Sequence, residues 1–323
     1  EVNLQATRDR FEVGDLTRTD VAQSEARLAL AQSQLRTAEA RLIGSRETYI
    51  RVVGTPPGVL AAPPTLPNFP DDVGTAEQTA LANNPFLEAA KLARDASRYD
   101  VSVAKASRLP QVSVGVGGDY YNYLGSVGSQ AAASGLKGDG FATTLGAQVT
   151  LPIFQGGRPA AQVRQARARE GAAIEQVTLT ERGVIAQARS AFAAYDSSLK
   201  VIESSRVAVE ANKLSLEGVR AENSVGTRTI LDILNAEQEL LNSQVNYVTA
   251  ERDAYVAGFT LLASMGRAEA KDLGLDGGPL YDPAANYERV RGRWSDWADG
   301  PKPVGTSTST SGTPAQGATV TST

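Results

Sequence analysis

The sequence predicts a mainly α-helical protein, built from long coiled-coil hairpins that occur twice and from one pair of β-strands. Three observations predict this fold class. A proline-free stretch from Ala160 to Gly278 has helical periodicity, the segment from Val13 to Gly54 resembles the segment from Val225 to Gly266, and two segments in the middle of the chain alternate with a period of two.

The proline-free stretch is typical of one very long helix, a tight turn and a second helix that returns. From Arg158 to Glu222 the first helix would measure about 100 Å at about 1.5 Å per residue, so we expect a rod. Its apolar or small residues recur every three or four places, as in a helix packed along its length against others. These are Ile174, Val177, Val184, Ala188, Ala191, Tyr195, Ile202, Val209, Leu216 and Val219.

The hairpin occurs a second time earlier in the chain. When Val13 is aligned with Val225 and Gly54 with Gly266, twelve positions are identical without a gap, which indicates a duplicated supersecondary unit. The second copy has a much longer helix before its turn. We therefore expect residues 1–10 to end a helix that starts before residue 1, in a chain that is a fragment lacking a first strand pair. No signal peptide is recognisable at its start.

The composition excludes several function classes. Cysteine and histidine are absent, which removes thiol catalysis, the usual zinc sites, disulfides and histidine-containing triads. We therefore expect no enzyme, no cofactor and no metal. The net charge of −4 disfavours nucleic acid as a partner. Four arginines at helical spacing are expected to lie on a solvent-exposed face of the long helix: Arg158, Arg164, Arg167 and Arg169. No apolar run approaches the length of a membrane-spanning helix, which is roughly 20 residues.

The first hairpin has a turn from Phe11 to Asp20, where Gly14 is free to take a positive φ and Thr17 or Thr19 is placed to cap the next helix. The returning helix runs to about Val53 and has apolar residues in strict sevens: Leu28, Leu35, Leu42 and Tyr49. Gly54 ends it. A proline-rich connector from Thr55 to Asp72 follows, which cannot be helical.

Helices then lead to the alternating segments. A short helix is expected from Thr75 to Ala82, and Asn84-Pro85 starts another as N-cap and first helical residue, up to Leu109-Pro110. Two strands follow. One face carries Val112, Val114, Val116, Gly118 and Tyr120 of the first strand, and Phe141, Thr143, Leu145, Ala147, Val149, Leu151 and Ile153 of the second.

Each alternating segment has the length that a tilted strand needs to cross a bilayer, and aromatic residues lie near one end. A small sheet packed on helices is the alternative, and alternation alone does not decide between them. The loop from Leu124 to Gly140 is rich in Gly, Ser and Ala and is expected to be flexible and exposed. Leu151 to Gly157 leads into the long helix.

The C-terminal part changes character after Gly266. Trp294 and Trp297 are expected to pack the last structured turn against the rod, while the Ser/Thr-rich end has too few apolar side chains to order itself. The predicted segments are 1–54 (second half of the first repeat), 55–74 (connector), 75–110 (helices), 111–154 (transmembrane β-hairpin), 155–266 (long periplasmic hairpin), 267–299 (C-terminal equatorial segment) and 300–323 (disordered tail).

Four motifs, in this order and inside a duplication, resemble the TolC family of outer-membrane efflux and secretion proteins. They are the tip Val13–Val21, the helix from Asn84-Pro85 to Leu109-Pro110, the junction Leu151–Gly157 and the tip Val225–Ala236. The resemblance covers residues 1–266. It implies a homotrimer whose strands form one shared 12-stranded barrel in the outer membrane, with a helical tunnel across the periplasm. It also implies an adaptor protein and an inner-membrane transporter as partners.

The resemblance places a periplasmic gate at the hairpin tips. It implies that Arg228 bonds to Thr19 and Asp20 of the first hairpin as a latch, and that Asp232 forms a ring of carboxylates. Many members have a second aspartate at Asn235, so this ring has less charge here, and Asn223 replaces an aromatic residue. The expected adaptor contacts are Val13, Gly14, Val225, Gly226 and Thr227. Asp20 and Asp232 are also suited to cap helices, which is compatible with gating.

The leading hypothesis is therefore the exit duct of a tripartite efflux or type I secretion system, located in the outer membrane with a periplasmic tunnel. The alternative is a soluble periplasmic adaptor, which also uses long coiled-coil hairpins but needs a small β-rich domain around them. The sequence does not identify the substrate, because small molecules and unfolded polypeptides pass through ducts of the same design.

Overall fold

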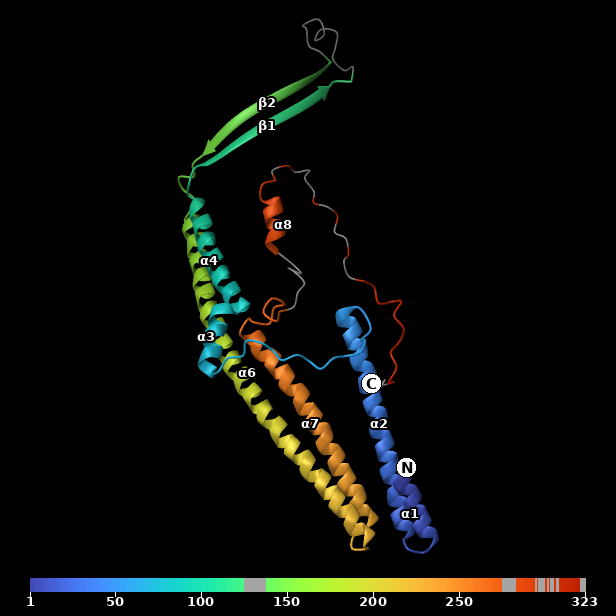
Figure 1. Ribbon diagram of the computed structural model, residues 1–323. Helices are drawn as coiled ribbons and strands as arrows, with labels where there is room; N and C mark the ends of the chain where they lie inside the picture. Colours follow the sequence, from blue (N-terminus) through green and yellow to red (C-terminus); the bar gives the residue numbers. More distant parts are fainter. Residues whose placement is uncertain are drawn as a thin grey trace. The chain divides into compact units, whose positions relative to one another are not determined.

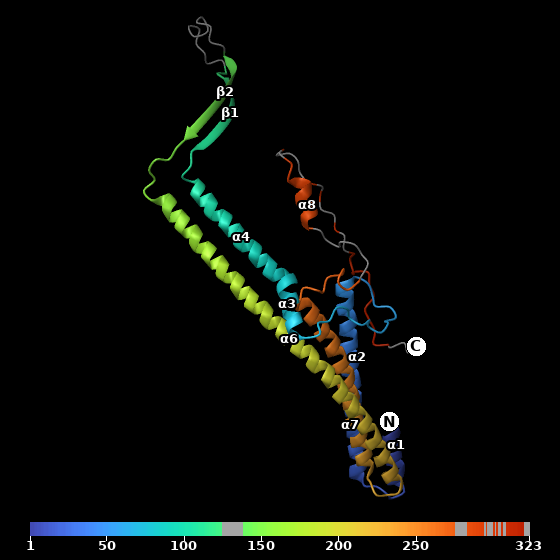
Figure 2. The ribbon, with the colours of Figure 1, turned by 60° about the vertical axis from the view of Figure 1, so that its left-hand side comes forward.

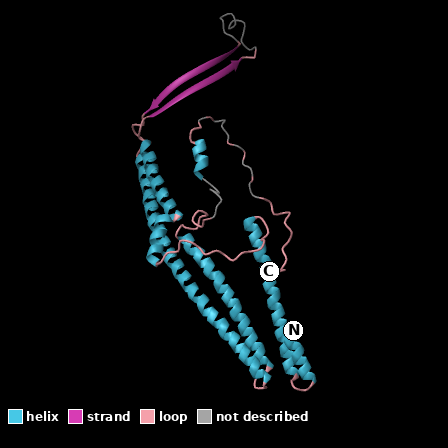
Figure 3. Ribbon diagram, in the orientation of Figure 1, coloured by secondary structure: helices cyan, strands magenta, loops and turns pink. Residues whose placement is uncertain are grey.

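The structure is a computed structural model that describes residues 1–124, 138–274, 283–293, 295, 300, 302, 305 and 308–319. Its elements are α1 (Val2–Glu12), α2 (Arg18–Val53), α3 (Val73–Asn83), α4 (Pro85–Ala106), β1 (Gln111–Asn122), β2 (Asp139–Thr150), α6 (Arg158–Ser224), α7 (Ile230–Ser264) and α8 (Pro283–Val290). The predicted class, long helices with one antiparallel strand pair, is confirmed (Figure 3). The chain divides into two units, one of residues 1–73 and 189–323 and one of residues 74–188.

The first unit contains both helical hairpins. α2 returns beside α1, and α7 returns beside the second part of α6 (Figure 1). As predicted, α2 ends at Gly54, which takes a left-handed conformation with φ of 89°. The residues of α2 spaced by seven are incompletely covered in the single chain, since Leu35 is 57% and Tyr49 is 38% exposed.

The proline-rich connector is not helical, as expected, and it packs on the second hairpin. The ring of Phe69 stacks on Tyr195, with centroids 4.6 Å apart and planes 11° apart. The hydroxyl of Tyr255 donates to the carbonyl of Pro64 at 3.1 Å. Gly258 provides the space for this contact, because a Cβ there would lie 3.0 Å from both Leu66 and Phe69. The absence of a side chain on α7 therefore lets the connector approach closely.

Backbone groups of the C-terminal residues 308–319 hydrogen-bond to side chains of α2. Arg46 of α2 donates to the carbonyls of Gly317 and of Thr319, the latter at 3.0 Å, and the N–H of Gln316 donates to Glu47 at 3.0 Å. Sequence reasoning considered only apolar burial, whereas backbone groups of this segment bond to two charged side chains of a helix. The expected packing of Trp294 and Trp297 lies outside the described residues.

The second unit contains α3, α4, the first part of α6 and the strands. α4 lies along α6 (Figure 2), and small apolar side chains fill the unit's interior: Ala76, Ala80, Leu87, Val101, Val163, Ala166, Val184 and Ala188. Asn84 caps α4 as predicted, because its side-chain oxygen accepts from the N–H groups of Phe86 at 3.0 Å and Leu87 at 3.4 Å. Among the described residues, no helix is both long and apolar enough to cross a membrane.

The strands pair so that the two predicted apolar faces coincide. Residues directly opposite each other share a face in an antiparallel pair. The apolar face consists of the pairs Val112 with Val149, Val114 with Ala147, Val116 with Leu145, Gly118 with Thr143, and Tyr120 with Phe141. Every residue of β1 and all but one of β2 are exposed, so none of the described helices covers this sheet. Most of the predicted loop, 125–137, lies outside the described residues.

Candidate functional site: the hairpin tips

The two helical hairpins turn in the same way. After α1, Gly14 has φ of 82°, its N–H donates to the carbonyl of Phe11 at 2.9 Å, and the N–H of Asp15 donates to Arg10 at 2.9 Å. This is a Schellman motif, which requires a residue that tolerates positive φ. The second turn repeats it at the aligned positions, with Gly226 (φ 81°) donating to Asn223 and Thr227 donating to Glu222, both at 3.0 Å.

The helices that leave the two turns start with matching capping boxes. The N–H of Thr17 donates to Oδ2 of Asp20 at 2.9 Å, and the hydroxyl donates to the same oxygen at 2.7 Å. In return, the N–H of Asp20 donates to the Thr17 hydroxyl at 3.3 Å. Thr229 and Asp232 make the same three bonds at 2.9, 2.8 and 3.3 Å. Both predicted gate aspartates therefore cap helices.

These bonds favour the ionised aspartates. The hydroxyl of Thr17, followed by its N–H, lowers the pKa of Asp20 below its ordinary value. At Asp232 the N–H of Thr229 is the largest cause of the lowered pKa, followed by its hydroxyl, with a smaller contribution from Arg228. In the described part of the chain, every hydrogen bond to these two carboxylates goes to Oδ2. Oδ1 of each stays available to another partner.

An ion pair spans each turn, with opposite polarity in the two copies. Arg10 donates to Asp15 at 2.8 Å in the first, and Arg228 donates to Glu222 at 2.7 Å in the second, which raises the pKa of Arg228. Among the described residues, no ion pair joins Arg228 to Asp20, so the predicted latch does not form within one chain. Thr19 is exposed. Sequence reasoning missed the partner of Arg228.

The first tip packs against the second through Leu16. Leu16 is partly buried against an apolar cluster of the second hairpin, formed by Leu216, Ile230 and Ile233. In the alignment of the two copies, Leu16 falls on Arg228, which is exposed. The two turns thus share a backbone, but one presents an apolar side chain to its neighbour and the other presents a cation to solvent.

Hydrogen bonds also join the hairpins just behind the tips. Arg27 of α2 donates to Asn235 of α7 at 2.7 Å, and Asn3 donates to Glu237 at 2.8 Å. Asn235, predicted as a gate residue, is therefore bound to the first hairpin of its own chain. Within the second hairpin, Arg220 also donates to Glu237 at 2.8 Å.

The Arg220–Glu237 pair has a counterpart in the first copy, because Arg8 donates to Glu25 at 2.6 Å. Both residues of one pair fall on those of the other when the two copies are aligned. The repeat alignment that starts at Val13 does not include Arg8. Extended upstream, it places Arg8 on Arg220 and would have predicted both ion pairs.

The outermost residues of the tips are open to solvent. Val13 is 80% and Val225 is 74% exposed, and Gly14, Gly226 and Thr227 are exposed as well. The two turns therefore each present an exposed valine at the equivalent position.

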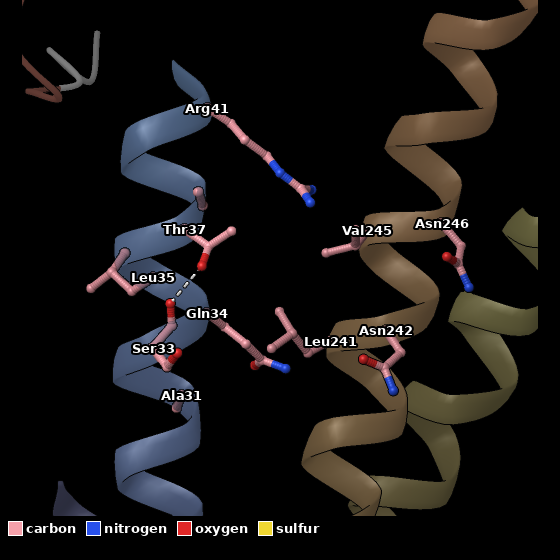
Figure 4. Close-up of a pocket in the computed structure, with 11 residues that line it drawn as sticks. Ala31, Ser33, Gln34, Leu35, Thr37, Arg41, Leu241, Asn242, Val245 and Asn246 are labelled. Atoms are coloured by element: carbon pink, nitrogen blue, oxygen red, sulfur yellow. Dashed lines mark hydrogen bonds between the residues drawn. The ribbon is translucent and has the colours of Figure 1, made fainter. Parts of the chain in front are cut away.

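A groove of about 770 Å³ lies between α2 and α7, farther from the turns. Figure 4 shows Gln34 and Arg41 of α2 extending toward α7, with Leu241 and Val245 of α7 facing them. Leu241 is 44% and Val245 is 56% exposed. The hairpins therefore diverge above their contact at the tips and leave partly apolar walls. The residues described include no cluster of acidic side chains suited to hold a metal ion.

Comparison with known proteins identifies relatives over most of the chain. The family described as "Outer membrane efflux protein" matches residues 77–267. The chain is 34% identical over 298 residues to outer membrane efflux protein BepC of Brucella suis, covering 90% of this chain and 62% of BepC. It is 31% identical over 259 residues to outer membrane protein TolC of Escherichia coli, covering 76% of this chain and 52% of TolC.

Among solved structures, the outer membrane protein VceC from Vibrio cholerae matches with a TM-score of 0.62 at 23% identity, covering 81% of this chain and 62% of VceC. This likeness concerns the fold alone. The chain thus spans between about half and two thirds of the length of these relatives.

Proposed function

Because the chain belongs to the outer membrane efflux protein family, we propose that it forms part of an exit duct that conducts substrate across the periplasm and the outer membrane. The duct serves a tripartite efflux or type I secretion system. It is a homotrimer that works with a periplasmic adaptor and an inner-membrane transporter. The family consists of channel proteins and not enzymes. Membership in this family favours a channel over the alternative of a soluble periplasmic adaptor.

The observation that carries this proposal is the exposed strand pair. Val112, Val114 and Val116 are 69%, 71% and 75% exposed, and their partners on β2 extend the same apolar face. An apolar face of this extent is unfavourable in water, and each strand of 12 residues is long enough to cross a bilayer when tilted. The face is therefore the lipid-facing side of a transmembrane hairpin.

Two strands cannot span a membrane alone, because the outer edge of each would leave backbone groups unpaired in lipid. The duplication supports a second strand pair in the intact polypeptide, which gives four strands per protomer. Three protomers then close one barrel of twelve strands, and no edge remains.

Cysteine labelling tests which face meets lipid, and the natural absence of cysteine makes single substitutions clean. Val114→Cys lies on the apolar face, whereas Gln148→Cys lies on the opposite face of the neighbouring strand. In outer membranes, a water-soluble maleimide should label Gln148→Cys and leave Val114→Cys unlabelled until detergent is added. Equal labelling of both variants in intact membranes would exclude the transmembrane assignment.

We further propose that the hairpin tips are the periplasmic gate of this duct. Asp20 and Asp232 cap their helices through Oδ2 and keep Oδ1 for a second contact. In the closed trimer, Arg228 exchanges Glu222 for Thr19 and Asp20 of a neighbouring protomer, and Asp232 lines the constriction. Asn235 fixes the two hairpins of one protomer to each other through Arg27 and adds no charge to the ring.

The adaptor contacts the solvent-exposed end of the tips. Val13 and Val225 supply equivalent apolar contacts, and Gly14, Gly226 and Thr227 leave the backbone of the turns accessible. Val13→Asp and Val225→Asp should each reduce crosslinking to the adaptor in cells while leaving the trimer intact. Unchanged crosslinking in both variants would contradict this contact surface.

A further inference from the structure

Four cations of the second unit gather where the helices meet the strands. Lys105 and Arg108 lie at the end of α4, and Arg158 and Arg164 lie at the beginning of α6. We call these four residues the cationic collar. Because Gln111 pairs with Thr150, the residues that precede β1 and those that follow β2 leave the same end of the sheet. A groove lined by both Lys105 and Arg167 likewise places the end of α4 beside the first turns of α6.

The collar makes no ion pair in the described part of the chain, and all four side chains are exposed. Asp95 and Glu170 line the same groove as Lys105, without an ion pair to it. Acidic residues are absent from 101–118 and from 140–169, although the whole chain has 36 acidic and 32 basic residues. The cluster is thus a local excess of positive charge in an acidic protein.

An apolar zone separates the collar from the apolar sheet face. Leu109 is 60%, Ile153 is 92% and Phe154 is 88% exposed in the two segments that connect strands to helices. From the sheet toward the helices, the surface therefore changes from apolar strands to apolar connections and then to cations. This order matches the profile of a lipid leaflet from acyl chains to phosphate groups.

We propose that the cationic collar binds the phosphate groups of anionic phospholipids in the periplasmic leaflet, an inference that rests on the proposed membrane insertion of β1 and β2. Arg158 and Arg164 suit this ligand because a guanidinium donates two parallel hydrogen bonds to phosphate oxygens. The sequence had indicated only a solvated face for these arginines. The structure adds Lys105 and Arg108 from another helix and the adjoining apolar zone.

The collar ends before Arg169. At about 1.5 Å per residue, Arg164 lies about 9 Å and Arg169 about 17 Å along α6 from Arg158, so Arg169 is farther from the segment that joins β2 to α6. Arg167 lines the groove next to Lys105, together with Asp95 and Glu170. Neither residue is needed for the proposal.

The test is a titration of the purified full chain, in neutral detergent, with phosphatidylglycerol, with bound lipid counted by native mass spectrometry. We compare Arg158→Gln/Arg164→Gln with the charge-preserving Arg158→Lys/Arg164→Lys. Arg182→Gln/Lys213→Gln serves as the matched control, since both of these cations are exposed and lie far along α6 from the strands.

We expect the glutamine double variant to bind phosphatidylglycerol about 25-fold more weakly, at about fivefold per lost charge, while the lysine and control variants stay within about threefold of the wild type. Equal affinity of wild type and glutamine variant would overturn the proposal, as would an equal loss in the control. Outer-membrane fractionation of the wild type is measured in parallel. If the protein is absent from that fraction, the proposed function itself fails, whereas its presence with unchanged lipid affinity refutes only the collar.

Discussion

Thr17→Ala should loosen the start of α2 by a predictable amount. The substitution removes the hydroxyl bond to Asp20 at 2.7 Å and the acceptor of the Asp20 N–H at 3.3 Å, but it keeps the backbone bond at 2.9 Å. Replacing a threonine N-cap by alanine typically costs about 1 kcal/mol. This corresponds to an increase of about fivefold in the local opening equilibrium of the first turns of α2.

Hydrogen-deuterium exchange measured by mass spectrometry on peptides that cover the start of α2 reports this opening. The matched variant is Thr229→Ala, which removes the corresponding bonds at the start of α7. Each alanine variant should accelerate exchange about fivefold in its own hairpin and leave the other unchanged. Thr17→Ser keeps the hydroxyl and should exchange like the wild type.

The pKa of each aspartate gives a second readout. The Thr17 hydroxyl lowers the pKa of Asp20, and the Thr229 hydroxyl lowers that of Asp232. Each alanine variant should therefore raise the pKa of its own aspartate and leave that of the other unchanged, as measured by carboxylate NMR titration. Unchanged exchange in both alanine variants, or a serine variant as labile as alanine, would refute the capping argument.

Three further predictions follow from other contacts. Arg228→Ala should increase single-channel conductance in planar bilayers, whereas Glu222→Gln, which removes only the partner within the turn, should not; an unchanged conductance in Arg228→Ala would count against the latch. Gly258→Val should lower the free energy of unfolding by about 1–3 kcal/mol, because its side chain would displace Leu66 and Phe69, and a denaturant titration measures this loss. Acid should loosen the tips, because the folded chain lowers the pKa of Asp20 and Asp232 below 3.8. The stability that these two caps contribute is complete above about pH 4 and is lost as the pH falls through the lowered values. A protection factor of the tip amides that stays constant below pH 3.8 would contradict the capping role.

The elements that the sequence predicted well are those with a local physical signal. Gly54 after a helical repeat, Asn84 before Pro85, and threonines three residues before aspartates each specify an end of a helix through backbone groups nearby in sequence. The alternation from Val112 to Tyr120 specified the apolar face. It did not specify the register with β2, because a slip of two residues would also keep both apolar faces on the same side.

The contacts that the sequence did not reveal depend on side chains with several possible partners. Arg228 has Glu222 in its own turn and Asp20 in another hairpin, and charge alone does not choose between them. Arg46 binds backbone carbonyls near Gly317, which leave no trace in composition or periodicity. Long polar side chains of this kind are placed by the fold and not by their neighbours in sequence.

The different side chains at Leu16 and Arg228 affect how the two copies tolerate change. After a duplication, equivalent positions begin under the same constraint. Leu16 now contacts an apolar cluster and should accept only apolar side chains of similar size. Arg228 is exposed and paired with Glu222, so the constraint at its position is on charge and not on apolar packing. A deep mutational scan should therefore give different tolerance profiles at two sites that share one backbone geometry. Because the two turns have a common origin, such a difference would show the effect of their present surroundings alone.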